Sequence, residues 1–155
     1  MHLVTRTVNC AMKKYSQIDA NFKNHLRSLV QLALSDEQFD TEEKKMIYNL
    51  GMANKISKYE INSLIQEELS KKHFESVTFS PLSFDERFEF LYNIIQLMKV
   101  DRKVFLAEIK YCEGTSRRLG FKERVVGELS KKIFADPVIT ANRQVLRKIA
   151  KRYEL

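Results

Sequence analysis

Two stretches of the chain decide how the sequence is interpreted: residues 26–45, LRSLVQLALSDEQFDTEEKK, and residues 91–110, LYNIIQLMKVDRKVFLAEIK. They lie 65 residues apart, and the match continues without a gap over residues 26–69 and 91–134. Any two amphipathic helices share apolar positions at some offset, but a gapless register that also pairs acids and a glutamine indicates an internal repeat. The identical pairs are Leu26/Leu91, Gln31/Gln96, Leu32/Leu97, Asp36/Asp101, Glu43/Glu108, Lys45/Lys110 and Leu64/Leu129.

The composition favours helices. With 155 residues the chain has the length of one domain, and its 4 glycines and 2 prolines are too few for a turn-rich all-β protein. Segments beginning at Ser16, Asp40, Ser57 and Ser83 resemble capping boxes, because an acid follows each cap residue after three positions. Apolar residues at helical spacing follow these segments. We predict helices near residues 17–34, 41–53, 58–73, 84–99, 105–119, 122–134 and 141–153.

The predicted architecture is one all-α domain of about seven helices, built from two related helical repeats, over residues 17–155. Residues 1–16 have weak periodicity and are predicted to be an N-terminal extension. The sequence contains no apolar run of about 18 residues, as a membrane span requires, and no secretion signal, so we expect a cytoplasmic protein. Cys10 and Cys112 are far apart and lack a CxxC motif, which argues against a disulfide framework or a zinc site. We expect Cys112 to be buried, and the isolated His25 to be at the surface or partly packed.

The formal net charge of +7 is concentrated in the second half of the chain. Residues 77–155 hold 16 Lys and Arg against 10 Asp and Glu, whereas residues 1–76 hold 11 against 10. A basic amphipathic helix can bind anionic lipid or nucleic-acid phosphates, but the last predicted helix has a short apolar face without Trp or Phe. We therefore expect its apolar residues to pack on the domain and its basic residues to face solvent. The apolar residues are Val145, Leu146 and Ile149, and the basic ones are Arg143, Arg147 and Lys151.

Each repeat contains an acidic turn. An apolar helix is followed by an aspartate, Asp36 or Asp101, and seven positions later an acid, Glu43 or Glu108, opens the next helix. This arrangement resembles the tellurite-resistance TerB-like family, whose duplicated helical pattern often has an Ala-Asp-Gly turn here. The resemblance covers residues 17–134. It implies an all-helical domain whose acidic positions bind a divalent metal, in proteins linked to tellurite resistance, stress responses or envelope-associated complexes.

The chain departs from that family pattern at three positions. The glycine after the first aspartate is replaced by Glu37 in one turn and Arg102 in the other, and Phe105 stands where the first turn has Asp40. Arg102 and Lys103 would repel a cation near the second turn. We therefore expect any cation to bind the first turn before the second.

Two interpretations of the acidic turns remain open on the sequence alone. The carboxylates supply hard oxygen ligands of the kind that Ca²⁺ and Mg²⁺ prefer, although the spacing is not that of an EF-hand. Alternatively, Asp40 caps a helix and Glu43 closes the capping box, which contributes about 1–2 kcal/mol without any ligand. The candidate metal ligands are Asp36, Asp40, Glu43, Asp101 and Glu108.

The motifs of common enzymes are missing from the sequence, which has no Gly-rich phosphate loop, GxSxG or HExxH. No catalytic residue and no other cofactor is predicted. We expect a non-enzymatic interaction or metal-responsive module with a protein partner of unknown identity. The alternative is an enzyme of unrecognised type, or a basic module that binds nucleic acid or a membrane surface. Base-stacking aromatics do not alternate with the basic residues, which makes nucleic acid the less favoured ligand.

Overall fold

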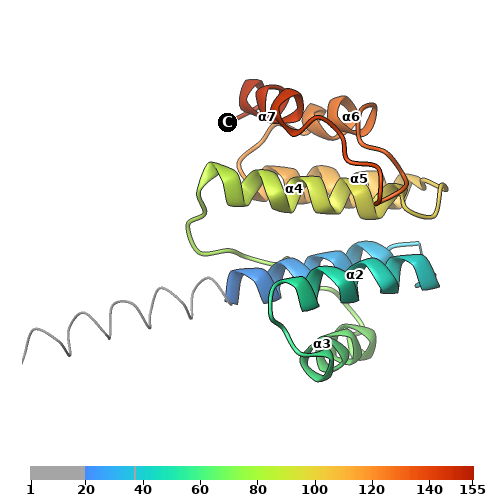
Figure 1. The fold of residues 1–155 in the computed structure, drawn as a ribbon. Coiled ribbons are helices and arrows are strands. Elements are labelled where there is room, and N and C mark those ends of the chain that lie inside the picture. Colours follow the sequence, from blue (N-terminus) through green and yellow to red (C-terminus); the bar gives the residue numbers. More distant parts are fainter. Residues whose placement is uncertain (1–19, 37) are drawn as a thin grey trace, which may run out of the picture.

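The computed structural model describes residues 20–36 and 38–155 (Figure 1). These residues form seven helices and no strand, apart from an isolated bridge between Phe121 and Glu154. The all-α prediction is therefore confirmed. The first helix is described over residues 20–34, and the others are α2 (Thr41–Ala53), α3 (Lys58–Ser70), α4 (Phe84–Lys99), α5 (Leu106–Arg118), α6 (Arg124–Ser130) and α7 (Arg143–Arg152).

The helices are arranged in stacked layers (Figure 1). The first helix and α2 form one central pair, and α4 and α5 form the other. Helix α3 lies outside the first pair, while α6 and α7 lie outside the second. The first helix and α4 run in the same direction, so the turns that follow them, residues 35–40 and 100–105, lie at the same end of the molecule (Figure 1).

The 65-residue offset recurs in the boundaries and hydrogen bonds of the elements. Helices α2 and α5 begin and end 65 residues apart, as do the ends of the first helix at residue 34 and of α4 at residue 99. The turns that follow α2 and α5 are also alike. Ile56 N donates to Gly51 O at 3.0 Å, and Phe121 N donates to Ser116 O at 2.9 Å.

The predicted capping boxes at Asp40 and Ser83 are both present, which explains why α2 and α4 begin where they do. Ser57 caps α3 by accepting from Glu60 N at 3.2 Å. Helix α3 ends at Ser70, earlier than predicted, because the next residue is extended. Helix α6 is shorter than predicted, since the chain turns after Ser130 and the Lys99 ammonium binds the Ser130 carbonyl and a further carbonyl of that turn. The predicted box at Ser16 and the predicted extension, residues 1–16, lie outside the described residues.

The core lies between the central helix pairs, and His25 belongs to it. This side chain is 1% exposed, which corrects the expectation of a surface or partly packed histidine. Its ring stacks on Phe90 with a centroid distance of 4.1 Å, and Asn93 hydrogen-bonds its Nε2 atom at 3.1 Å. Burial lowers the pKa of His25 to about 3, so the ring is neutral at physiological pH. Cys112 is fully buried, as expected.

Helix α7 differs from its prediction on both faces. Leu146 and Ile149 are buried, but Val145 is 41% exposed. The basic residues do not simply face solvent. Arg143 lies over the Tyr92 ring at 4.3 Å and pairs with an acid of α4, and Arg147 lies over the Phe84 ring at 5.4 Å. These residues anchor α7 to α4, which makes them less available to an anionic ligand.

None of the helices in the described part of the chain combines the length and the apolar character that a membrane span needs.

Candidate metal centre

The fold brings the acidic turns of the two repeats together, although 65 residues separate them in the sequence. Asp36 follows the first helix, Asp101 follows α4, and Glu43 and Glu108 lie in the first turns of α2 and α5. Because these four helices meet at one end of the molecule, the predicted residues form one cluster (Figure 1). The expectation of a stronger first site and a weaker, separate second site is therefore wrong.

Three of the carboxylates are close enough to share one ion. Asp36, Glu43 and Asp101 each offer an oxygen atom, and these atoms all lie within 4.8 Å of one another. The two aspartates are held in the same way. Asp36 Oδ1 accepts from Gln38 N and Asp101 Oδ1 accepts from Lys103 N, both at 3.0 Å. Each aspartate thus has one oxygen fixed by the turn.

Glu43 takes part in a helix cap as well. Its Oε2 atom accepts from Asp40 N at 3.2 Å, and Asp40 Oδ1 accepts from Glu43 N at 3.0 Å, which completes the capping box. The capping interpretation is therefore confirmed for these two acids. It does not account for the burial of Glu43, which is only 1% exposed and faces Asp36 and Asp101.

Glu108 has no such explanation. Its side chain is 1% exposed, and neither carboxylate oxygen has a hydrogen-bond partner among the described residues. The suggestion that Asp101 and Glu108 form a hydrogen-bonded pair is therefore wrong. A buried carboxylate without partners costs several kcal/mol when it is ionised, so native structures pair it, protonate it or place it against a cation.

Mutual repulsion and burial shift the titration of the cluster. Burial is the largest cause that raises the pKa of Glu43 to about 8 and that of Glu108 to about 7, and the charges of Asp36 and Asp101 raise both further. The pKa of Asp101 is also raised, mainly by burial and then by nearby acids that include Asp40. Without a cation, the cluster retains protons near neutral pH.

The arrangement fits a hard divalent cation. Oxygen ligands of Ca²⁺ lie about 2.3–2.6 Å from the ion, so opposite ligands are about 4.6–5.2 Å apart. The oxygens of Asp36, Glu43 and Asp101 lie within this span, and Glu108 adds a fourth carboxylate without another partner. The basic residues of the second turn do not oppose this, because Arg102 and Lys103 are exposed to solvent. A backbone φ of 63° at Arg102 accompanies the turn that fixes Asp101.

All five candidate ligands named from the sequence contribute to this end of the molecule. Asp36, Glu43 and Asp101 form the mutually close group, Glu108 is the buried acid beside it, and Asp40 caps α2 and raises the pKa of Asp101 and Glu108. Sequence analysis missed the combination of the two turns into one site. The signal was present in the offset, because related units that pack side by side can place equivalent residues opposite one another.

A comparison of the chain with known protein families, curated proteins and solved structures finds no match.

Proposed function

We propose that the protein is a non-enzymatic module that binds one divalent cation, with Ca²⁺ as the best fit, between the acidic turns of its two repeats. The single observation that carries the proposal is the buried Glu108 carboxylate, which lacks a partner beside three carboxylates in mutual reach. Helix capping explains Asp40 and one oxygen of Glu43, but it offers no role for Glu108.

The origin of the ligands supports a responsive role. Two ligands come from residues that follow the first helix and α4, and two come from the first turns of α2 and α5. A cation at this point would link all four central helices at one end of the bundle. Binding would replace the retained protons with a metal charge, and it would stabilise the folded state in proportion to cation concentration. Such a module converts cation concentration into domain rigidity.

The resemblance to the TerB-like family belongs to the same proposal. It is supported by the order of apolar helix, aspartate and acid in both turns and by the 65-residue offset. A role in tellurite resistance or another stress response follows from this resemblance as an expectation. The neighbouring genes provide a separate test, since a stress-resistance cluster is expected around the gene.

Calorimetric titration of the EDTA-treated full chain with CaCl₂, MgCl₂ and MnCl₂ tests the binding. We expect one Ca²⁺ per chain, with protons released at pH 7, and weaker binding of Mg²⁺ because its shorter bonds need closer ligands. Asp36→Asn and Glu108→Gln should each abolish most of the heat. Glu42→Gln, which removes an exposed acid of the first turn, should retain it.

The variant Asp40→Asn separates capping from cation binding. Asparagine caps a helix about as well as aspartate, so the stability of the metal-free protein should be nearly unchanged. Amide shifts around residues 36–43 and 101–108 should follow Ca²⁺ in the wild type. If those shifts stay still at millimolar Ca²⁺, the carboxylates serve only the fold and the proposal is wrong.

A further inference from the structure

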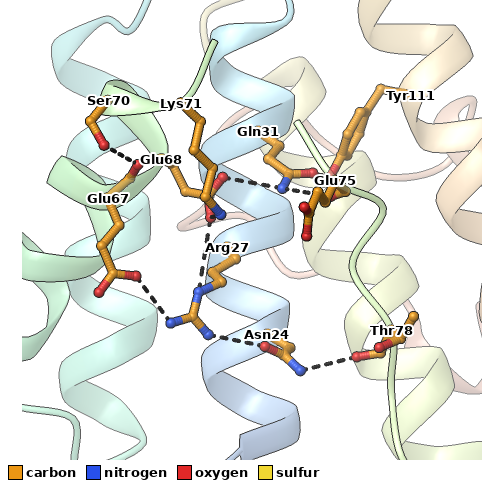
Figure 2. A network of polar contacts seen from close by, with 10 residues as sticks. All are labelled: Asn24, Arg27, Gln31, Glu67, Glu68, Ser70, Lys71, Glu75, Thr78 and Tyr111. Carbon is orange, nitrogen blue, oxygen red and sulfur yellow. Dashed lines mark hydrogen bonds and ion pairs between the residues drawn. The ribbon is translucent and has the colours of Figure 1, made fainter. Parts of the chain in front are cut away.

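The first repeat contains a groove that the chain itself fills. After α3, residues 71–83 run in an extended form back along the first helix (Figure 2). Three amide side chains of that helix hold the backbone of this segment. Gln31 Nε2 donates to Glu75 O at 3.2 Å and Asn24 Nδ2 donates to Thr78 O at 3.0 Å, while Asn21 Oδ1 accepts from Ser80 N at 2.9 Å.

Gln31 is the central contact of this arrangement. It is 2% exposed, and its Nε2 atom also donates to Glu68 at 3.2 Å. Tyr111 of α5 donates to its Oε1 atom at 2.9 Å (Figure 2). The amide is therefore fully used by α3, α5 and the extended segment together.

Gln96 occupies the equivalent position of the second repeat, 65 residues later, but its amide is not used in this way. The side chain is 6% exposed, and its Nε2 atom has no hydrogen-bond partner among the described residues. A buried amide donor without a partner costs about 1–3 kcal/mol. Gln96 lines a hollow of about 390 Å³ between α4 and α2, where Met46 stands at the position that corresponds to Tyr111.

This hollow adjoins a second one. Leu50 lines both, and the second has a volume of about 650 Å³ with Phe22 and Phe90 in its walls. Glu86 and Glu89, which correspond to Asn21 and Asn24, also line it. The two hollows thus follow α4 as the extended segment follows the first helix.

The chain leaves this second groove open because its path differs after α6. The residue that corresponds to Thr78 is Arg143, where α7 begins. Asp136, Pro137 and Val138 reach the hollow beside Gln96, and the chain then turns into α7 instead of continuing along α4. The groove therefore retains an apolar floor and an unused amide donor, without the backbone that fills its counterpart.

We propose that the groove between α2 and α4 binds an extended segment of a partner protein, with a main-chain carbonyl of that segment accepting from Gln96 Nε2. Main-chain hydrogen bonds supply affinity in such complexes, and pockets for alternate side chains supply specificity. The walls also define the charge of the partner, because they carry five acids against the three basic residues Lys45, Lys55 and Arg143. The segment should combine apolar side chains with at least one lysine or arginine. The five acids are Glu42, Asp85, Glu86, Glu89 and Asp136.

The chain provides its own probe. A fluorescein-labelled peptide with the sequence of residues 72–83, KHFESVTFSPLS, carries the substitution Glu75→Lys to suit the acidic walls. We expect this peptide to bind the full chain saturably, and a scrambled peptide of equal composition to bind at least tenfold more weakly. Titration followed by NMR should shift the side-chain amide signals of Gln96 and the methyl signal of Met46.

Two variants and a control test the location. Gln96→Leu removes the donor and also the buried unpaired group, so it should fold and weaken the peptide at least fivefold. Asn49→Trp fills the hollow from an exposed position on α2 and should abolish binding. Gln66→Trp, at an exposed position of α3 outside both hollows, should leave binding unchanged.

Three results would overturn the proposal. The first is the absence of saturable binding at millimolar peptide. The second is a set of shifts at Gln31 and Tyr111 with none at Gln96, which would mean that the peptide displaces the chain's own segment. The third is a dimer in sedimentation experiments that Asn49→Trp dissociates, since the occupant would then be a second copy of the chain.

Discussion

Replacement of Glu108 by glutamine should stabilise the metal-free protein at pH 8 and remove its response to Ca²⁺. Burial and neighbouring acids raise the pKa of Glu108 from the ordinary 4.5 to about 7. The folded state therefore holds a proton that the unfolded state has lost, and the stability from this group declines as pH rises from about 4.5 to 7. The pKa difference corresponds to about 3 kcal/mol, since each pH unit contributes about 1.4 kcal/mol.

Urea unfolding in EDTA at pH 5 and pH 8, followed by circular dichroism, measures this effect. The difference in unfolding free energy between Glu108→Gln and the wild type should be about 2 kcal/mol more favourable to the variant at pH 8 than at pH 5. Any fixed cost of the buried amide cancels in this comparison. Addition of Ca²⁺ at pH 8 should stabilise the wild type but not the variant.

The exposed acid Glu42 provides the control, because Glu42→Gln removes a charge from the same end of the molecule without altering the buried group. It should change stability by less than about 0.5 kcal/mol at either pH. A difference between Glu108→Gln and the wild type that does not depend on pH would refute the reasoning. Glu108 would then be neutral, or ionised and paired, throughout the range.

Further predictions concern packing and the buried histidine. Gly51→Ala should destabilise by about 1–3 kcal/mol, because the added Cβ would lie 2.5 Å from an isoleucine side chain of α3; Gly127→Ala, whose Cβ meets nothing within 4 Å, should stabilise by about 0.5–1 kcal/mol, and thermal unfolding compares the two. Leu146→Ala should cost about 2–5 kcal/mol in urea unfolding, whereas Val145→Ala should cost less than about 1 kcal/mol, since only the first is fully buried. For His25, whose pKa of about 3 lies below the ordinary 6.5, stability is lost as pH falls from 6.5 towards 3. His25→Phe should therefore lose about 2 kcal/mol less than the wild type between pH 7 and pH 5, and an equal loss in both proteins would contradict the neutral buried ring.

Much of the fold could be predicted because helix starts depend on local chemistry. The Asp40 and Ser83 caps require only residues three positions apart, and α2 and α4 have the predicted bounds. The short α6 could not be predicted, because Lys99 binds the carbonyls of its last turn from a distant helix. Val145 was misplaced for a similar reason, since the position of α7 depends on which α4 side chains its arginines contact.

The sequence by itself determined the helical class, the 65-residue offset and the identity of the five candidate ligands, because periodicity, capping and residue type are local properties of the chain. Only the tertiary structure decided that Asp36 and Asp101 face one another across the two repeats and that Glu108 is buried without a partner. It also decided that Gln31 is used while Gln96 is not. The physical reason is that burial, hydrogen bonding and charge repulsion depend on distances between segments, and those distances are fixed only when the apolar faces of the helices pack into one core.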